Sequence, residues 1–417
     1  MDRLISPGAV KEALDYSIDV LKRLISIPTV APQGDHYEEA AELLAKELEG
    51  LDFEVEVIKV PMEYQKEKCK NASNNPRYIV LGRKGEGARL HFNGHYDVVP
   101  GGQGWTVTEP FKPVVKDGRL YGRGAIDMKG GIAAALGSFK ALKLDSKEPG
   151  LTLEAAFVPD EEIGGECGTG YLLEQIESPD YLLLPEPSGL EHPWHGHKGA
   201  VWVRVRVRGV NAHASTPWLG RNAFLLAAGL ALDVQQALAS KLPGRKTKHP
   251  IKPEDAAYPT AAIGGVAGVP GGGKTNQVPG EFIFTIDRRT IPEETVEEVL
   301  DELKGIVRWA AVARGLRLGE YEVELEHSMP AVVNDPGELY DALRNAGMAA
   351  GIEVGEPHLC PGGLDMRYYV VKGVKSISYG PSGEVAHAPD EYIDLGELEK
   401  LIEVYAGTAL LLGRRGG

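Results

Sequence analysis

The stretch ARLHFNGHYDVVP, residues 88–100, joins an apolar run to two polar side chains that follow it closely. The run Ala88–Phe92 predicts a β-strand, and His95 comes at its end, where open α/β sheets form their ligand sites. Because residues two apart on a strand face the same way, the carboxylate of Asp97 can accept a hydrogen bond from the His95 ring. Such a pair is typical of a metal-bound histidine, and a polar loop is the alternative interpretation of these two residues alone.

Strand and helix patterns alternate on both sides of this stretch. Apolar or alternating runs predict strands at 53–60, 78–81, 151–158 and 181–184, and helical spacing predicts helices at 36–50 and 130–142. A helix at 339–349 and a strand at 376–378 resume the pattern after Pro330. The alternation predicts an α/β fold with a mostly parallel sheet.

The run VWVRVRVR, residues 201–208, marks a change in this pattern, because it alternates strictly, as a strand with one face exposed to water does. It is followed by a predicted helix at 222–240, a Gly-rich segment at 264–273, a strand at 281–287 and a helix at 293–314. We therefore predict that residues 1–198 and 330–417 form one domain and that residues 199–329 form a smaller inserted α/β domain.

Composition excludes several classes of partner. The chain has 417 residues and a formal net charge of −15, with 43 % hydrophobic and 25 % charged residues, as in a globular protein of two domains. An acidic chain lacks the excess of Lys and Arg that neutralises phosphates, which argues against a nucleic-acid or anionic-membrane partner. We also expect no signal peptide and no run of about 18 apolar residues.

Cysteine usage indicates a reducing compartment. The three cysteines, Cys69, Cys167 and Cys360, are odd in number and widely spaced, so they match neither a disulfide framework nor a CxxC metal site. We expect Cys167 to be a packing residue and the protein to be cytoplasmic.

Further acidic or histidine-bearing segments follow predicted strands or Gly-rich turns. They are GRGAIDMKGG (122–131) with Asp127, PDEEIGG (159–165) with Glu161 and Glu162, LLLPEPSG (182–189) with Glu186, and VAHAPDEYI (385–393) with His387. Adjacent carboxylates repel one another, which favours a site where cations neutralise them. Each segment alone also fits a helix cap or an acidic surface loop.

Together these segments resemble the family of acetylornithine deacetylase, succinyl-diaminopimelate desuccinylase, glutamate carboxypeptidase and aminoacylase. The resemblance extends from about Ile18 to about Leu412 and is most specific in GWTVTEPFKPVVKDGRLYGRGAIDMKGG, residues 104–131. It implies two metal ions bridged by Asp127, with Glu161 as general base and Asp97 orienting His95. The other implied ligands are His95 and Glu186 for one metal and Glu162 and His387 for the other. His, Asp and Glu ligands without thiolate suit zinc, and also cobalt or manganese.

The same resemblance assigns roles in and near the inserted domain. It implies that His213 crosses a dimer interface to stabilise the developing oxyanion, so we expect a homodimer. The implied substrate-binding residues are Asn276, Arg289 (with Arg288 as the alternative), Gly363 and Arg367. Arg367 is expected to meet a free carboxylate of a small substrate, since a guanidinium matches a carboxylate with two hydrogen bonds.

We therefore predict a metal-dependent hydrolase that cleaves the amide bond of a small N-acyl amino acid, of the deacetylase or desuccinylase type. The alternatives are a carboxypeptidase, dipeptidase or aminoacylase of the same family, and a binding homologue that has lost catalysis. Two other patterns are set aside. The family places no ligand in the HxxHxH cluster at 192–197, and GGVAGVPGGGKT at 264–275 lacks the helix start of a phosphate loop.

Overall fold

The computed structural model describes residues 3–69, 71–383 and 385–414, and the chain divides into two compact units. The large unit comprises Met1–His195, Asn334–His358 and Leu364–Gly417, and the small unit comprises Gly196–Val333 and Leu359–Gly363. The inserted domain predicted at 199–329 lies within the main segment of the small unit. The sequence did not indicate that Leu359–Gly363 also belongs to the small unit.

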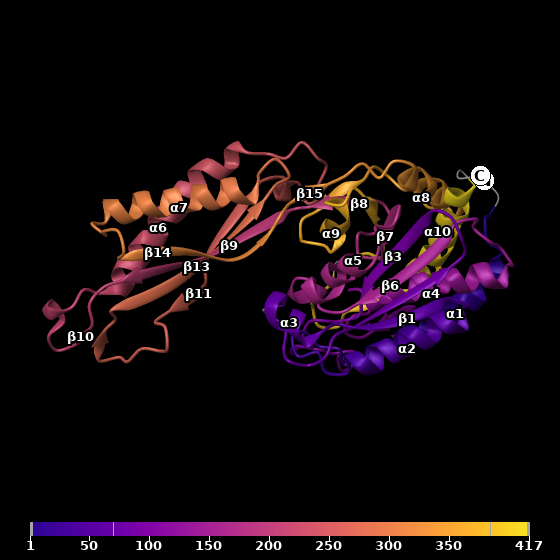
Figure 1. The fold of residues 1–417 in the computed structure, drawn as a ribbon, viewed down its shortest axis with the longest axis horizontal. Helices are drawn as coiled ribbons and strands as arrows, with labels where there is room; N and C mark the ends of the chain where they lie inside the picture. Colours follow the sequence, from indigo (N-terminus) through magenta and orange to yellow (C-terminus); the bar gives the residue numbers. More distant parts are fainter. Residues whose placement is uncertain (1–2, 70, 384, 415–417) are drawn as a thin grey trace. The chain divides into compact units, whose positions relative to one another are not determined.

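A mixed sheet of nine described strands includes the centre of the large unit, where six of them lie in the order β1-β2-β6-β3-β7-β17 (Figure 1). Their bounds are Glu54–Lys59 (β1), Tyr78–Lys84 (β2), Arg89–His95 (β3), Thr152–Val158 (β6), Tyr181–Leu184 (β7) and Lys375–Ser378 (β17). The last four strands in this order run parallel, whereas β1 and β2 are antiparallel to their neighbours. The expected mostly parallel sheet is confirmed at the centre and wrong at this edge, because periodicity reveals a strand but not its direction.

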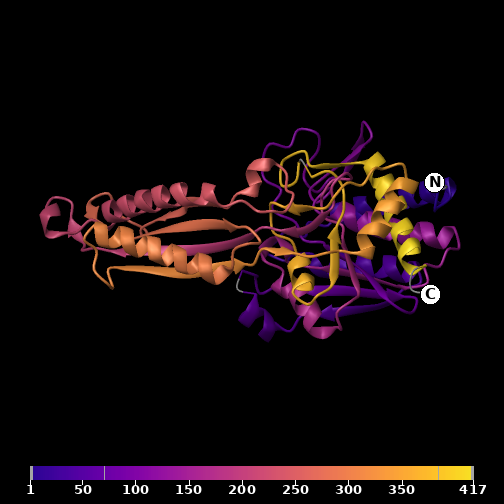
Figure 2. The same cartoon turned by 90° about the horizontal axis from the view of Figure 1, so that it is seen from above.

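A four-stranded antiparallel sheet in the order β11-β13-β9-β14 forms the core of the small unit. The bounds are Thr260–Gly268 (β11), Glu281–Thr290 (β13), Gly199–Arg208 (β9) and Tyr321–Met329 (β14), with helices Ala223–Lys241 (α6) and Val296–Ala313 (α7). Figure 2 shows α6 and α7 side by side along this sheet, and both helices contact β9. The predicted one-sided strand is confirmed, because the valines of β9 are buried while its alternating arginines are partly exposed.

Helix α6 is apolar on two sides. Its Leu230 and Val234 are buried in the small unit's core, whereas Leu225 and Leu232 are 64 % and 69 % exposed. Among the described residues, Ala223–Gly244 is the one helix that could cross a membrane by length and composition, and 33 % of its most apolar window is buried. Asp233, Gln235 and Gln236 interrupt this helix, so it is not an unbroken run of about 18 apolar residues. The same composition is typical of a helix that packs against a second element on its open side.

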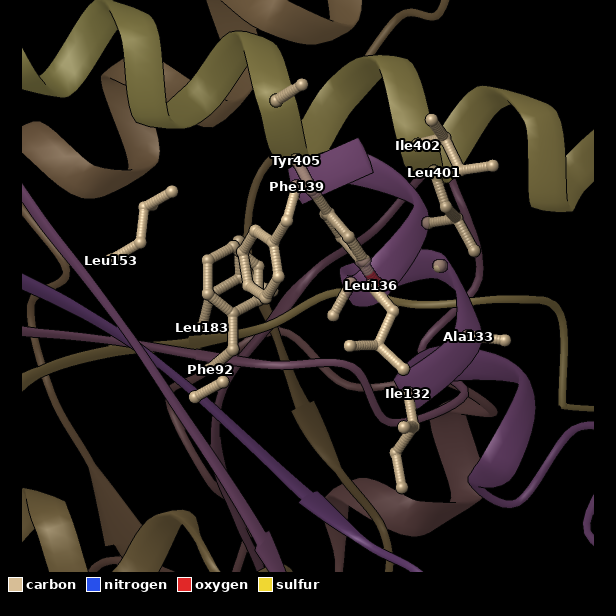
Figure 3. Close-up of a cluster of buried hydrophobic side chains, with 14 of the residues drawn as sticks. Phe92, Ile132, Ala133, Leu136, Phe139, Leu153, Leu183, Leu401, Ile402 and Tyr405 are labelled. Carbon is tan, nitrogen blue, oxygen red and sulfur yellow. The ribbon is translucent and has the colours of Figure 1, made fainter. Parts of the chain in front are cut away.

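Helix α4 lies at the centre of the large unit's core, where it contacts α1, α10 and β3. The bounds of the main helices are Pro7–Ser26 (α1), Tyr37–Gly50 (α2), Lys129–Leu144 (α4), Glu338–Ala349 (α8) and Leu395–Gly413 (α10). Close packing requires small residues, since a Cβ on Gly137 would lie 2.1 Å from Ser17 Oγ of α1. Figure 3 shows Phe92 of β3 beside Phe139 of α4, and the Phe92 ring also contacts that of Tyr405 of α10. This packing holds the end of β3, with His95, close to the start of α4, which follows Asp127.

Shorter elements frame the polar end of the large unit's sheet. They include α3 (Met62–Lys68), β4 (Val114–Lys116), β5 (Arg119–Tyr121), α5 (Tyr171–Gln175), α9 (Met366–Val370) and β18 (Tyr392–Asp394). Strands β18, β5 and β4 form a separate antiparallel sheet. This small sheet joins the segment after His387 to the segment before Asp127.

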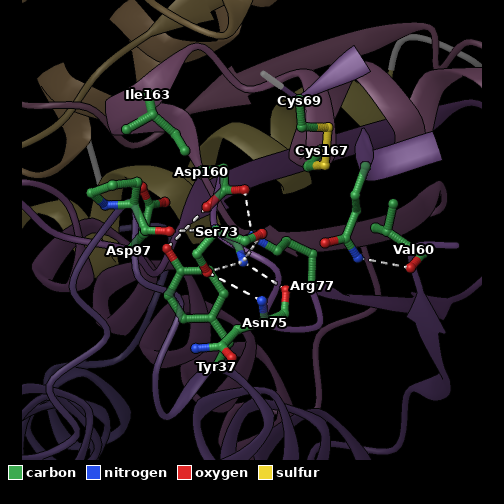
Figure 4. A network of polar contacts seen from close by, with 12 residues as sticks. Tyr37, Val60, Cys69, Ser73, Asn75, Arg77, Asp97, Asp160, Ile163 and Cys167 are labelled. Atoms are coloured by element: carbon green, nitrogen blue, oxygen red, sulfur yellow. Dashed lines mark hydrogen bonds and ion pairs between the residues drawn. A yellow bond between two sulfur atoms is a disulfide. The ribbon is translucent and has the colours of Figure 1, made fainter. Parts of the chain in front are cut away.

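Cys69 and Cys167 form a disulfide (Figure 4). The expectation that Cys167 is only a packing residue is therefore wrong. The two cysteines are 98 residues apart in sequence, and their pairing depends on α3 packing beside the turn that follows β6. Spacing along the chain carries no sign of such a contact.

Candidate metal centre

His95 closes β3 and is 1 % exposed. Its Nδ1 lies 3.0 Å from the main-chain oxygen of Asp97, which can only accept, so Nδ1 donates and Nε2 carries the lone pair in the neutral ring. That Nε2 lies 3.2 Å from Asp127 Oδ1 and 3.5 Å from Glu186 Oε1. Because ionised carboxylates also only accept, a proton or a metal ion among the three groups is needed to make the arrangement favourable.

A second set of ligand atoms forms on the other oxygen of Asp127. His387 Nε2 lies 3.2 Å from Asp127 Oδ2 and 3.1 Å from Glu162 Oε1. Asp127 therefore presents one oxygen to His95 and the other to His387, as a carboxylate that bridges two cations does. The structure brings together all five residues that the sequence named as ligands.

The electrostatics of these carboxyl groups also fit cations. Burial raises the pKa of Asp127, but hydrogen bonds from His387 and His95 outweigh it and hold that pKa well below its usual range. Burial and the Asp127 charge raise the pKa of Glu186 to about 7, and burial raises the pKa of Glu161 well above its ordinary value. Divalent cations would relieve this repulsion. Nitrogen and oxygen donors without sulfur suit zinc, cobalt or manganese, so the residues fit two such ions.

Glu161 and Glu162 lie in the tight turn Glu161–Ile163 that follows β6. Their main-chain N–H groups donate to the Asp97 carboxylate, at 3.2 Å and 3.1 Å. That carboxylate lies 3.5 Å from His95 Nδ1, farther than the Asp97 main-chain oxygen. The expected hydrogen bond between the Asp97 side chain and His95 is thus replaced. Asp97 orients His95 mainly through its own carbonyl and uses its carboxylate to hold the acidic turn.

The side chain of Glu161 faces the same centre, on the side of His95 and Glu186. A carboxylate oxygen of Glu161, one of Glu186 and a ring nitrogen of His95 all lie within 4.8 Å of one another. A carboxylate placed beside a metal site, yet outside the bridged pairs, can take a proton from a water bound there.

A buried ion pair connects the loops that carry Asp127 and His387. Glu391 accepts from Arg123 at 2.5 Å, and from the main-chain N–H groups of Ile126 and Asp127 at 2.9 Å and 3.2 Å. Arg123 also donates to the main-chain oxygen of His387 at 3.1 Å. Sequence reasoning missed both residues, although each stands four positions from a proposed ligand in a segment already singled out.

A family model described as peptidase family M20/M25/M40 matches residues 91–411, a range that contains all five ligand residues and Glu161. The chain belongs to this M20 family. The family resemblance drawn from the sequence is confirmed, and the chain is a hydrolase of the metallopeptidase type. A succinyl-diaminopimelate desuccinylase from Nautilia profundicola is 29 % identical over 406 residues, which cover 93 % of this chain and 97 % of the relative.

Solved structures show the same M20 fold. A dipeptidase from Saccharomyces cerevisiae superposes with a TM-score of 0.78 at 16 % identity, covering 98 % of this chain and 99 % of the other. A dinuclear metal-binding peptidase of the M20 family from Bacillus subtilis gives a TM-score of 0.67 at 16 % identity, covering 97 % and 99 % of the two chains.

In the small unit of this M20 chain, His213 lies on strand β10 (Ala212–His213), and Asn276 directly precedes the adjacent strand β12 (Gln277–Val278). Strand β10 pairs with β12, and Ala214 N–H donates to the Asn276 oxygen at 3.0 Å. His213 is exposed, and its Nδ1 accepts the main-chain N–H of Ser215 at 3.2 Å. In the neutral ring the proton is therefore on Nε2, which makes His213 a hydrogen-bond donor toward solvent.

The two neighbouring arginines of β13 face opposite sides of the small unit's sheet. Arg288 is fully buried on the helix side, where it donates to Glu294 at 2.5 Å. Arg289 lies on the open side with Asp287, whose carboxylate is 2.9 Å away, and its side chain is 35 % exposed. Only Arg289 of this pair is accessible to a substrate. Gly363 packs so closely that an added Cβ would lie 2.3 Å from Met329 Cε.

Arg367 has a different setting from the one expected. It is 8 % exposed and donates to the main-chain oxygens of Leu364, at 2.8 Å, and of Gly164. Its guanidinium also lies 4.5 Å from the ring centroid of Tyr368. These partners join Arg367 to the acidic turn, so the geometry does not support the expected open fork for a substrate carboxylate.

Proposed function

We propose that this M20 chain hydrolyses the amide bond of a small N-acyl amino acid with a free carboxylate, of the desuccinylase or deacetylase type. The observation that carries the proposal is the Asp127 carboxylate, whose two oxygens each face a different histidine–carboxylate set. The similarity to a desuccinylase at 29 % identity supports the substrate class.

Residues around the centre divide the chemistry among them. His95, Asp127, Glu162, Glu186 and His387 would hold two divalent cations, most simply zinc, which would supply Lewis acidity for the scissile carbonyl and for the attacking water. Asp127 joins the two ligand sets. Asp97 orients the His95 ring with its carbonyl and holds the acidic turn with its carboxylate. Glu161 takes a proton from the attacking water and returns it to the leaving amine.

The substrate carboxylate needs an accessible cation, and Arg289 fits this role better than Arg288 or Arg367. It lies on the open side of the sheet, whereas the donors of the other two arginines face buried partners. Asn276 and Gly363 remain predicted substrate contacts.

The test is metal analysis together with a substrate panel. Purified protein should hold two divalent metal ions per chain and lose activity on chelation. The panel contains N-succinyl-diaminopimelate, N-acetylornithine, simple N-acyl amino acids and dipeptides. Preference for dipeptides or peptides would replace the deacylase assignment by a peptidase of the same family. Two bound metals without hydrolysis of any amide would indicate a binding homologue.

We also propose that the protein works as a homodimer in which His213 serves the partner's site. The exposed apolar side of α6 supports this. So do Trp218 and Leu219, which follow His213 by five and six positions and are 75 % and 67 % exposed. The Nε2–H of His213 can donate to the oxyanion of the tetrahedral species, a contribution of about 3 kcal/mol in comparable sites.

Subunit complementation tests the shared site. Glu161→Gln chains are mixed with His213→Ala chains, and the mixed dimers are assayed. One of their two sites then contains both native groups, so activity should return toward half of normal. Mixed dimers as inactive as either parent would place His213 in its own chain's site or outside the reaction.

We place the protein in the cytoplasm as a further proposal. A disulfide is rare there, except in hyperthermophiles, whose intracellular proteins keep such bonds. Alkylation of thiols at the moment of lysis, followed by mass spectrometry, tests whether the Cys69–Cys167 bond exists in the cell.

A further inference from the structure

A short segment of the chain is tied to the acidic turn at three points. This segment, called the brace, consists of Cys69 and residues 71–77. Arg77 Nε donates to Asp160 Oδ2 at 2.7 Å, and Cys69 is disulfide-bonded to Cys167. Between these two ties, Asn71 Nδ2 donates to the main-chain oxygen of Ile163 at 3.4 Å. The tied residues lie on both sides of Glu161 and Glu162, so the brace runs along the turn that carries the proposed base.

Arg77 is the last residue of the brace, and its buried guanidinium ties the rest of the brace to the turn. It is fully buried and donates with Nη1 to the main-chain oxygen of Asn75, at 2.6 Å, and with Nη2 to that of Pro32, at 2.7 Å. Figure 4 shows this guanidinium between Asp160 and Asn75. A Cβ on Gly34 would lie 2.7 Å from Nη1, so the surrounding chain closes tightly on the guanidinium. A point charge such as a lysine ammonium cannot make all these directed bonds.

Asp160 passes this constraint to the turn. Its second carboxylate oxygen accepts from Tyr37 at 3.0 Å, and its backbone is left-handed, with φ at 65°. Its main-chain oxygen accepts the N–H groups of Ile163, at 3.2 Å, and of Gly165, at 2.7 Å. Both carboxylate oxygens of Asp160 are therefore held by hydrogen bonds, and this fixes the main chain of Asp160, whose carbonyl closes the turn. Asp97 holds the same turn through the main-chain N–H groups of Glu161 and Glu162.

We propose that the brace positions the Glu161–Glu162 turn, with Arg77 as its positioning residue and the Cys69–Cys167 disulfide as a second anchor. Arg77 touches neither the proposed metal ligands nor the base, and it acts through Asp160. The role in turnover rests on the proposed function, whereas the role in ordering the turn and the Glu162 ligand does not.

The experiment compares Arg77→Met and Arg77→Lys with Arg83→Met. Arg83 is the control, because it lies on strand β2, which begins directly after Arg77, and it also donates to a buried carboxylate, that of Glu154. The double variant Cys69→Ser, Cys167→Ser tests the second anchor. Hydrogen–deuterium exchange of peptides covering residues 159–170 is measured on each protein without metal, and zinc affinity is measured against a chelator.

Arg77→Met should speed exchange in the turn by about 10-fold or more and weaken binding of one of two zinc ions, while Arg83→Met leaves both near normal. Arg77→Lys should restore part of the protection, because it keeps the charge on Asp160. With saturating zinc, the Arg77→Met enzyme should lose kcat far more than KM changes, because the base is displaced while substrate contacts stay.

Unchanged turn exchange and unchanged zinc affinity in Arg77→Met would overturn the proposal, as would equal effects of the Arg83 control. If Arg77→Met does not fold, Asp160→Asn decides the matter, because it removes the ion pair with little change of shape. Normal exchange and zinc binding in Asp160→Asn would then refute the brace. Failure of every substrate in all variants would count against the proposed function alone, since exchange and zinc binding need no substrate.

Discussion

Removing Glu391 tests how far the buried ion pair with Arg123 supports the metal centre. Glu391 is fully buried and Arg123 is 2 % exposed, and the Glu391 carboxylate accepts three hydrogen bonds. Burial raises the pKa of Glu391, so the charged pair is not itself a source of stability. Glu391→Ala, however, leaves the Arg123 guanidinium buried without its carboxylate, and such a loss costs about 3–5 kcal/mol.

The assay is thermal unfolding together with elemental analysis. At about 2 °C per kcal/mol for a unit of this size, Glu391→Ala should lower the Tm by roughly 6–10 °C. Glu391→Gln keeps an acceptor for the Asp127 amide, so it should lose less. Because Arg123 also holds the His387 carbonyl, Glu391→Ala should lose most of one metal ion.

The control is Glu338→Ala, which removes a partly exposed ion pair with Lys375. That change should cost about 0–1 kcal/mol and leave the metal content intact. A Glu391→Ala protein that melts within a degree of wild type and keeps both metals would refute the reasoning.

The remaining predictions concern the reaction, the bridge, the disulfide and the substrate. Glu161→Gln should lower kcat by about 10²-fold or more with metal content unchanged, and near-normal turnover would remove Glu161 as the base. Asp127→Ala should lose both metals or most of the second, so two tightly held metals by elemental analysis would contradict the bridging role. The double variant Cys69→Ser, Cys167→Ser removes a cross-link between cysteines 98 residues apart. Its free energy of unfolding should fall by about 4–5 kcal/mol in the chain-entropy model, and an unchanged denaturant midpoint would refute this. Arg289→Ala should cost about 1.5–3 kcal/mol in transition-state binding of a carboxylate substrate but little for its amide analogue, and equal losses would mean a structural role.

The parts of the site that the sequence predicted are those carried by strand ends. His95 follows one apolar run, Glu161 and Glu162 follow a second, and Glu186 follows a third, so the pattern places each at a strand end. The parallel direction of these three strands, which the structure supplies, brings the ends to one edge of the sheet. Asp127 and His387 needed the family resemblance, because no local pattern distinguishes a bridging carboxylate from a helix cap. The structure then adds the geometry of the Asp127 oxygens, which no pattern contains.

What the sequence could not show is mostly contact between distant segments. Arg77 and Asp160 are 83 residues apart and Arg123 and Glu391 are 268 apart, so their pairing depends on the fold. Strand β11 was missed because glycines weaken the strand pattern in the segment described only as Gly-rich. The roles of Arg288 and Arg289 were open because adjacent residues differ only in the face of the sheet that they occupy.

The Cys69–Cys167 bond has a consequence for anyone preparing this protein. Once reduced, the pair becomes two thiols beside the acidic turn, and Cys167 stands five positions after Glu162. A thiolate binds zinc at least as readily as imidazole or carboxylate does, so the opened pair would compete for the ion meant for the centre. Dithiol reductants add a third competitor in solution. A preparation kept in such a buffer would therefore hold zinc at the thiols or in solution instead of at the metal centre. Its low activity would then reflect the missing metal and not the catalytic power of the intact centre.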